Sequence, residues 1–466
     1  MKSRSRRHRH KARWHEMTPD RAFWMFAIFA VLVFLMGGGS RYDIASVGPL
    51  RAMSAVFLAI GVYFQTGQNF RNVGALVALL FALGAWMVVQ LVPLPPSMWT
   101  ALYGREAIVQ AGAAAGLEQV WRPITFSTMR TFNSLASLVV PLTALILLSL
   151  LDESGWRRVR TLVIGLGVAS AILGIAQVTL RGSPGLYFYD ITNGDSAVGL
   201  FSNRNHNALF LNIALLFMIF RARGAGWSWK PADLFVLAGQ ILLLVAILIN
   251  GSRFGFVLLA FVALVFAVRA IRSGRAASTG DRSKGRSAKI AGILAAIAAI
   301  GLIAFFASVE RVPALARLFE QGVAQDLRAR SFPEVLQMAI GHFPFGVGFG
   351  AFEQAFRTIE PESLLSPSYF NQAHDDWLQI VVEGGLPAVS LLAIGLSLLV
   401  RRGWVIWRSR DILGAGLATP ALGFLTLLAI AMHSVVDYPL RVPSLMVVAT
   451  IALGMIFKTR AVIRKV

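Results

Sequence analysis

The chain alternates long apolar runs with short polar connections, and this pattern limits the possible fold more than any other feature. About twelve runs approach the 20 apolar residues that a helix needs to cross a bilayer. The chain is 56% hydrophobic and only 14% charged, with a mean hydropathy of +0.65, which exceeds what a soluble domain of this size requires. We therefore predict an all-α polytopic membrane protein. Its expected transmembrane helices cover about 22–37, 51–66, 72–92, 131–150, 159–180, 198–220, 232–250, 254–270, 289–308, 378–400, 412–433 and 443–457.

The distribution of charge predicts the orientation of these helices. With the N-terminus in the cytoplasm, an even number of spans returns the C-terminus there, and about 30 of the 44 Lys and Arg residues fall in cytoplasmic connections. About 16 of the 23 Asp and Glu residues fall on the other face. The positive-inside rule thus accounts for the net charge of +21 better than nucleic-acid binding does. We expect membrane lipids as partners and no nucleic acid.

Composition shifts divide the chain into four segments. A basic arm, 1–21, precedes the first helices in 22–189. A core, 190–445, contains a large polar loop, 308–377, that we expect in the periplasm with short helices of its own. Residues 446–466 complete the last helix and form a basic cytoplasmic tail. The first apolar run could pass for a signal peptide, but the topology favours an uncleaved helix.

Polar residues capable of chemistry gather where spans end on the predicted outer face. Each cluster lies beside or between apolar runs, so the topology predicts that they converge on one side of the bilayer. Each cluster is weak evidence alone, because polar residues also occur at the ends of structural helices. The clusters are Gly199–Asn207, Asn250–Arg253, Leu327–Arg330, Phe343–Glu353, Asn371–Trp377 and His433–Arg441.

Taken in order, these clusters resemble the O-antigen ligase and O-antigen polymerase superfamily, bacterial inner-membrane glycosyltransferases of surface polysaccharide assembly. The resemblance covers about residues 190–445. Two positions depart from the usual pattern: Asp375 stands where Asn is frequent, and Pro333 where an aromatic residue is frequent. The motifs that carry it are Phe-Ser-Asn-x-Asn-His (201–206), Ser-Arg (252–253), Pro-x-Gly-x-Gly-x-Gly-x-Phe (344–352), Ala-His-Asp-Asp-x-Leu-Gln (373–379), Glu-Gly-Gly-Leu-Pro (383–387) and His-Ser-x-x-Asp-Tyr-Pro (433–439).

The resemblance implies a glycan donor on undecaprenyl pyrophosphate and an acceptor hydroxyl at the periplasmic face. It assigns Arg253 and Arg330 to the pyrophosphate, with Arg328 as a rival for the second role. Guanidinium groups suit this role because their fixed donors pair with phosphate oxygens in a two-pronged manner.

An acceptor hydroxyl needs a base that is active near neutral pH, and His374 is the candidate. We expect Asp376 near the N-cap of the tenth span, where a carboxylate would orient the imidazole and the helix dipole would favour its neutral form. Asp375 and Asp376 are thus supporting residues. Further supporting candidates from other clusters are Asn203, Arg204, His206, His433 and Asp437.

Structural roles compete with these functional ones. His374 could be an interfacial polar residue, and Arg253 could be an anchor that extends its charge to the headgroups. Arg204 and His206 could cap the sixth span, and the His433–Arg441 cluster could form an ion pair between the last two spans. Glycines 346, 348 and 350 lack the strand and helix of a nucleotide loop, so we interpret them as a tight turn that packs the outer loop on the membrane domain.

The reaction expected from the resemblance requires neither a cofactor nor a metal, and the chain contains no HExxH pattern and no cysteine. A metal-independent inverting ligase that transfers the glycan to lipid A-core is favoured. A polymerase of O-antigen or exopolysaccharide uses the same parts with a second lipid-linked repeat as acceptor, and transfer to protein hydroxyls is a further alternative. A lipid-linked sugar flippase is the alternative from another class, although charged residues and repeated halves within the spans are not evident.

Overall fold

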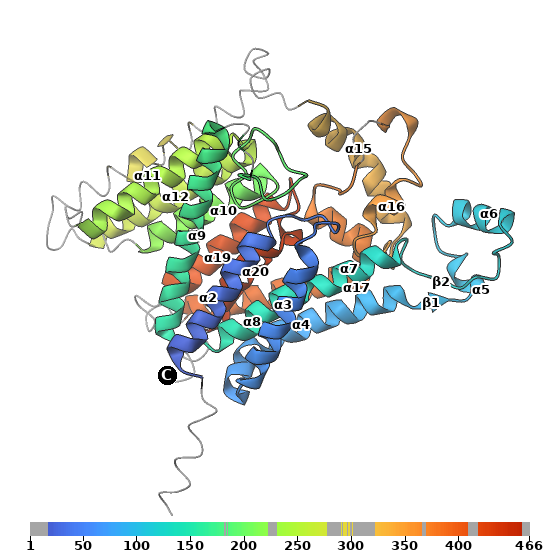
Figure 1. Cartoon of the computed structure of the whole chain (residues 1–466), viewed down its shortest axis with the longest axis horizontal. Coiled ribbons are helices and arrows are strands. Elements are labelled where there is room, and N and C mark those ends of the chain that lie inside the picture. The colour runs from blue at the N-terminus through green and yellow to red at the C-terminus, as the bar shows by residue number, and fades with distance from the viewer. Residues whose placement is uncertain are drawn as a thin grey trace, which may run out of the picture.

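Helices account for nearly all the regular structure of this chain (Figure 1). The structure, a computed structural model, describes residues 17–180, 183, 185–221, 231–276, 322–365, 370–408 and 418–458, with isolated positions between 290 and 301. In this part of the chain the only strands are two short segments in an outer loop. The all-α prediction is confirmed. The ninth predicted span, 289–308, the N-terminal arm up to 16 and the tail from 459 lie largely or wholly outside the described residues.

Helices occupy the other predicted spans. In the part of the chain that the structure describes, seven helical segments are long and apolar enough to cross a membrane, and α3, α19 and α20 are shorter apolar helices. The chain is thus a multi-pass membrane protein, while the count of twelve and the side of the termini stay predictions. The bounds are α2(Pro19–Met36), α3(Val47–Tyr63), α4(Gly67–Leu91), α7(Thr128–Ser137), α8(Val139–Ser149), α9(Glu153–Thr179), α10(Arg204–Arg221), α11(Pro231–Asn250), α12(Arg253–Ala276), α17(Asp376–Arg408), α19(Ala418–His433) and α20(Pro443–Lys458).

Several of these helices begin where a polar side chain caps them. Thr18, Thr66, Ser127 and Asp152 precede α2, α4, α7 and α9, and each side chain accepts a hydrogen bond from a backbone N–H of the first turn. Such caps satisfy N–H groups that have no partner inside the helix. These caps therefore help to set where α2, α4, α7 and α9 begin.

Helix α10 lies at the centre of the bundle. Residues 206–219 of α10 are all buried, and the helix packs against α9, α11, α12 and α19. The aromatic ring of Phe210 packs on Phe34 of α2, with ring centroids 4.7 Å apart. A helix that is apolar on every side has to be surrounded in this way. The polar residues at its N-terminal end are thereby brought into the interior of the molecule.

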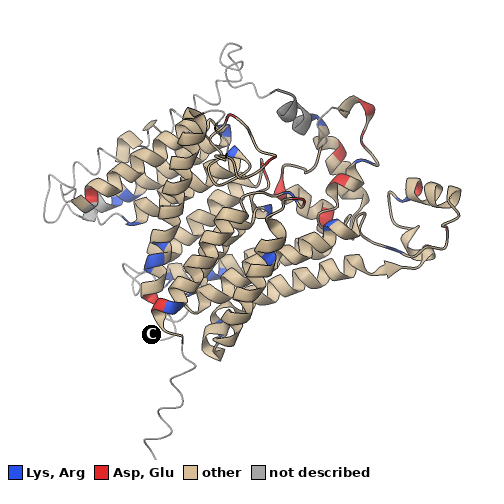
Figure 2. Cartoon of the chain, in the orientation of Figure 1, with Lys and Arg blue, Asp and Glu red and all other residues tan. Residues whose placement is uncertain are grey.

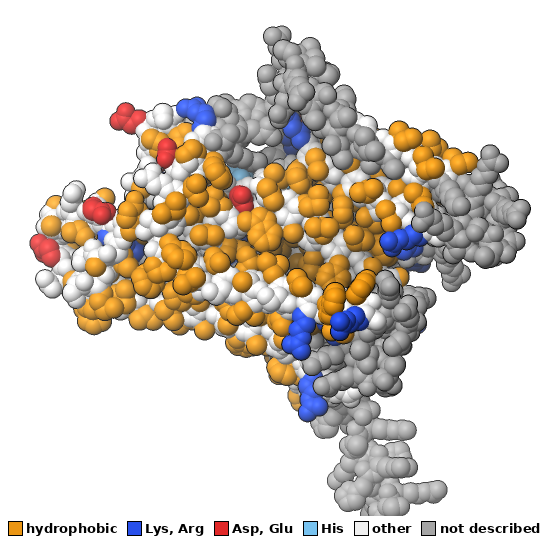
Figure 3. All heavy atoms as spheres, turned by 180° about the vertical axis from the view of Figure 1, so that it is seen from behind, with side chains coloured by type: hydrophobic (Ala, Val, Ile, Leu, Met, Phe, Trp, Pro, Cys, Tyr) orange, Lys and Arg blue, Asp and Glu red, His pale blue; other side chains and the backbone are white. Residues whose placement is uncertain are grey.

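The helix ends separate into two groups, as the alternating topology predicts. At one end, Arg158 of α9 pairs with Asp20 of α2 at 2.8 Å, and Lys458 of α20 pairs with Glu153 at 3.3 Å. Acidic residues are most frequent toward the other end, around the connection from α4 to α7 and the connection before α17 (Figure 2). We call these connections the outer loops and this end of the bundle the outer end. Between the ends the surface is broadly apolar, with the charged side chains around its borders (Figure 3). This surface suits the interior of a bilayer.

The connection between α4 and α7 forms an arm that extends away from the bundle (Figure 1). Strands β1(Pro93–Leu94) and β2(Arg122–Pro123) pair antiparallel at its base, with Pro93 opposite Pro123. The arm carries α5(Pro96–Trp99) and α6(Glu106–Ala114). Its base is attached to the other outer loop, because the backbone N–H of Phe126 donates to the carbonyl of Val347.

The second outer loop contains α15(Gly322–Gly341), α16(Phe352–Phe356) and η3(Glu362–Leu364). Between α15 and α16, its glycine-rich turn closes on a break in α17, where Gly385 has φ +59° and ψ −155°. The N–H groups of Val347 and Gly348 donate to the carbonyls of Val382 and Glu383, which the break leaves without helical partners. The prediction that these glycines form a tight turn on the membrane domain is confirmed.

Gly385→Ala is expected to destabilise the protein by about 2 kcal/mol or more, because the left-handed conformation disfavours a Cβ and this Cβ would collide with the carbonyl oxygen of Pro344. The matched control is Gly395→Ala, in the regular part of the same helix, where a Cβ has no neighbour closer than 3.8 Å. Thermal unfolding in detergent should show a lower midpoint for the first variant only. Equal midpoints would contradict this account of the break.

Candidate functional site

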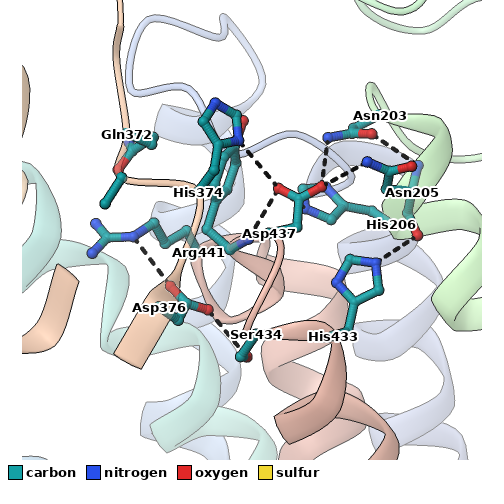
Figure 4. A network of polar contacts seen from close by, with 12 residues as sticks. Asn203, Asn205, His206, Gln372, His374, Asp376, His433, Ser434, Asp437 and Arg441 are labelled. Atoms are coloured by element: carbon teal, nitrogen blue, oxygen red, sulfur yellow. Dashed lines mark hydrogen bonds and ion pairs between the residues drawn. The ribbon is translucent and has the colours of Figure 1, made fainter. Parts of the chain in front are cut away.

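A buried carboxylate, Asp437, lies at the centre of the polar residues at the outer end (Figure 4). It belongs to the connection between α19 and α20. The side-chain amide of Asn205 donates to its Oδ2 at 3.0 Å, the amide of Asn203 approaches the same atom at 3.4 Å, and the backbone N–H of Tyr438 donates to Oδ1 at 3.0 Å. A buried charge requires such donors. The start of α10 is thereby joined to the last connection of the chain.

Two histidines face Oδ1 of Asp437 from different elements. Nε2 of His206, in the first turn of α10, lies 3.7 Å away, and Nδ1 of His374, just before α17, lies 3.8 Å away. These distances exceed a hydrogen bond but allow a strong interaction in a buried site. Burial alone would raise the pKa of Asp437, yet His206, His374 and His433 together hold it well below its usual value. Asp437 is therefore a carboxylate that stays ionised among imidazoles.

His374 is held in an uncommon backbone conformation. Its φ of +52° lies in the left-handed region, which non-glycine residues seldom adopt and which often occurs at functional sites. Asp375 caps the following helix by accepting from the N–H groups of Trp377 and Leu378 at 2.9 and 3.1 Å. The imidazole also lies beside the ring of Tyr438, with centroids 5.0 Å apart. The turn thus directs the His374 side chain toward Asp437, and 15% of that side chain remains exposed.

The second acidic residue of the motif, Asp376, faces away from this imidazole. Its carboxylate lies 3.5 Å from Nε of Arg441 and 3.4 Å from the hydroxyl of Ser434. Arg441 also pairs with the buried Glu383 at 2.8 Å. Asp376 lies next to the N-cap as expected, because it is the first residue of α17 and Asp375 caps the helix. The expectation that a carboxylate at this helix start orients His374 is wrong, since the carboxylate beside the imidazole is Asp437. Sequence spacing could not show this, because Asp437 is distant in the chain.

The turn between α11 and α12 lies against the same cluster. Ser252 donates to the side-chain oxygen of Asn205 at 2.8 Å, and the amide of Asn250 donates to the carbonyl of Arg204 at 2.9 Å. Arg253 begins α12 and lies close enough to Arg204 for the two guanidinium groups to repel each other. Arg204 and Arg253 thus begin the two helices, α10 and α12, whose first turns border the Asp437 cluster.

The remaining predicted residues lie on α19 and α15. His433 ends α19, and its Nε2 lies 3.1 Å from the carbonyl of Asn205. Arg330 lies on α15 with an exposed side chain that donates to the carbonyl of Ser363 at 2.9 Å. The backbone of Arg328 is part of α15, and its side chain lies outside the described part of the chain. The structure thus brings Asn203, Arg204, His206, Arg253, His374, His433 and Asp437 together, and places Arg330 in the outer loop.

Sequence reasoning missed two residues that hold this site in place, Asn205 and Glu383. Both stand inside the quoted motifs, so a signal was present, but neither has an evident chemical role without its neighbours. In the described residues no group of three or more His, Cys, Asp or Glu side chains is arranged to hold a metal ion. The arrangement can accept a proton on an imidazole and can attract an anion to adjacent guanidinium groups.

The fold and the site together define a multi-pass membrane protein with a histidine–carboxylate centre and adjacent arginines at one end of its helices. Residues 238–393 match the family described as O-Antigen ligase. This match confirms the resemblance to the O-antigen ligase superfamily over that part of the chain. A search of curated proteins found no match.

Asp437→Asn is expected to lower the free energy of unfolding by about 3 kcal/mol, because the histidines lose a buried charge partner. Since the pKa of Asp437 is lowered, this stabilisation is present above the usual aspartate value of about 3.9 and is lost as the pH falls further, through the lowered pKa. Thermal unfolding between pH 7 and 3 measures it. Asp43→Asn, at an exposed pair with Arg41, is the control and should cost less than about 1 kcal/mol.

Proposed function

We propose that this protein is a metal-independent inverting glycosyltransferase of the O-antigen ligase type. It transfers a glycan from undecaprenyl pyrophosphate to an acceptor hydroxyl at the periplasmic face of the inner membrane. Lipid A-core is the favoured acceptor, and a second lipid-linked repeat would make the same protein a polymerase. The observation that carries the proposal is the approach of His374 Nδ1 to the buried carboxylate of Asp437, at 3.8 Å, with Arg204 and Arg253 at the start of the neighbouring helices.

In the proposed reaction, His374 is the general base. Its Nδ1 faces Asp437, so Nε2 receives the proton of the acceptor hydroxyl while the hydroxyl oxygen attacks the anomeric carbon. The bond from that carbon to the pyrophosphate breaks, and the electron pair leaves with the phosphate oxygen. Asp437 stabilises the imidazolium that forms and holds the ring in one orientation. General-base catalysis of this kind contributes about 10²- to 10⁴-fold to a rate.

Arginines near His374 would balance the charge that grows on the leaving pyrophosphate. We assign Arg253 to the donor pyrophosphate, as the resemblance implies. Because Arg204 lies near Arg253, we place Arg204 at the pyrophosphate too. Arg330 remains a candidate for the second contact from the outer loop, with Arg328 as its rival. Such guanidinium groups stabilise a phosphate leaving group without a metal ion.

The distribution of buried charge favours an enzyme over a flippase. In the described residues the buried Asp, Glu, Arg and His side chains are Arg105, His206, His342, Glu353, Asp376, Glu383, His433 and Asp437. All of them lie in outer connections or within the adjoining two turns of a helix. A translocation path for a charged lipid-linked sugar would require ionisable groups near the middle of the membrane.

His374→Ala is expected to reduce glycan transfer by about 10²-fold or more, because the acceptor hydroxyl loses its base. The assay uses purified protein with an undecaprenyl-pyrophosphate glycan and, separately, lipid A-core or a second lipid-linked repeat as acceptor, with EDTA present. Product on lipid A-core identifies a ligase, and product on the repeat a polymerase. Transfer by His374→Ala at the wild-type rate would contradict the proposed base.

Arg253→Lys is expected to slow transfer by roughly tenfold or more, because an ammonium group cannot form the two-pronged phosphate contact. Arg71→Lys, at an exposed position near the start of α4, is the matched control and should transfer at the wild-type rate. Steady-state kinetics with varied donor concentration measures both. Wild-type kinetics for Arg253→Lys would remove Arg253 from the phosphate site.

A further inference from the structure

A cavity of about 280 Å³ lies at the outer end, next to the histidine site. Its lining includes the polar residues Arg41, Arg51, Arg130 and Gln372 and the apolar residues Leu83 and Met87 of α4. This volume is near the lower limit of small-ligand pockets, about 300 Å³. The cavity therefore fits a headgroup with the start of a lipid chain and is too small for a whole glycan.

Two of the arginines around this cavity pair with carboxylates, and a third does not. Arg41 pairs with Asp43 at 2.6 Å, and Arg130 pairs with Glu353 at 3.0 Å. Arg51, half-buried in the first turns of α3, instead donates to the backbone carbonyl of Asn133 at 3.0 Å. Among the residues that the structure describes, no carboxylate lies within 4 Å of this guanidinium. A half-buried cation without an anionic partner is costly, and an anion in the cavity would remove that cost.

A single turn of the chain separates the cavity from the histidine site. Asn371, Gln372 and Asp376 line the cavity, whereas His374, between them in sequence, points to Asp437 on the other side. Figure 4 shows Gln372 on one side of His374, and Asp437 on the other. A ligand in the cavity would therefore lie against the turn that carries His374, whereas Arg204 and Arg253 are not among the lining residues of the cavity. Two substrates could approach the same base from opposite sides.

We propose that the cavity binds the phosphate-bearing headgroup of a lipid, with Arg51 as its principal contact and Arg130 as a second. The apolar residues of the lining take the first part of the lipid chain. This proposal rests on the proposed function for the identity of that lipid, which is the acceptor of the transfer. Lipid A-core and a lipid-linked repeat both carry phosphate next to a lipid, so the site serves either acceptor.

The binding test uses phosphatidic acid as the probe and diacylglycerol as its uncharged counterpart, with native mass spectrometry of the full-length protein in detergent. We compare Arg51→Gln, which keeps a donor for the Asn133 carbonyl but lacks the charge, with Arg51→Lys, which keeps the charge. Phosphatidic acid should bind about tenfold more weakly to Arg51→Gln and at an intermediate strength to Arg51→Lys. Arg71→Gln is the control and should bind as the wild type does.

Equal binding of phosphatidic acid to Arg51→Gln and Arg71→Gln would overturn the proposal, as would equal binding of phosphatidic acid and diacylglycerol to the wild type. Inorganic phosphate should not displace phosphatidic acid at an equal concentration, because it lacks the lipid chain. Displacement would overturn the lipid assignment in favour of a free-anion site. Thermal unfolding of each variant shows whether it is folded.

A kinetic test separates this proposal from the proposed function. With active protein, Arg51→Gln should raise the acceptor KM about tenfold and leave the donor KM unchanged. An unchanged acceptor KM would overturn the acceptor role. If the wild type transfers no glycan at all while binding of phosphatidic acid still depends on Arg51, the proposed function fails and the lipid site stands.

Discussion

The burial of the Asp437 carboxylate is the constraint on which the outer end of this protein depends. An ionised carboxylate inside a membrane protein persists only when donors and cations surround it. Those groups come from distant parts of the chain, since Asn205 lies 232 residues from Asp437. The two residues must be in contact for the negative charge of Asp437 to be stable in the interior. The first turn of α10, the turn before α17 and the connection from α19 to α20 are therefore held at one point, and His374 and His206 are held with them.

A second constraint is the break in α17 at Gly385. The break exposes backbone carbonyls that a continuous helix would have paired, and the glycine-rich turn of the outer loop satisfies them. Because the glycines lack side chains, the two backbones approach closely enough for hydrogen bonds. Gln90 of α4 strengthens the junction by donating to the carbonyl of Glu383 at 2.8 Å. The outer loop is thus attached to the membrane helices, and Glu383 is positioned to pair with Arg441.

These constraints explain why the turn at residues 371–376 can contact Arg441 on one side and Asp437 on the other. Asp375 caps α17, and the side-chain oxygen of Gln379 accepts from the N–H of Ala373 at 3.0 Å, so the turn is held at both ends. Asp376 is engaged by Arg441 on one side, and His374 faces Asp437 on the other. In the proposed transfer two substrates have to reach one base, and a rigid turn between the two proposed binding regions provides that geometry.

The amino-acid sequence by itself determined the helical class, the approximate helix bounds and the gathering of polar residues at one end, because hydropathy, caps and glycine positions act over short stretches of chain. The sequence also predicted the tight glycine turn and the resemblance to the O-antigen ligase superfamily. Only the tertiary structure decided that Asp437, not Asp376, lies beside His374, that Arg204 accompanies Arg253, and that Arg51 lines a cavity with no carboxylate of the described residues within 4 Å of its guanidinium. Each of these depends on the distance between atoms that are remote in sequence, and such distances are set by the packing of the whole bundle.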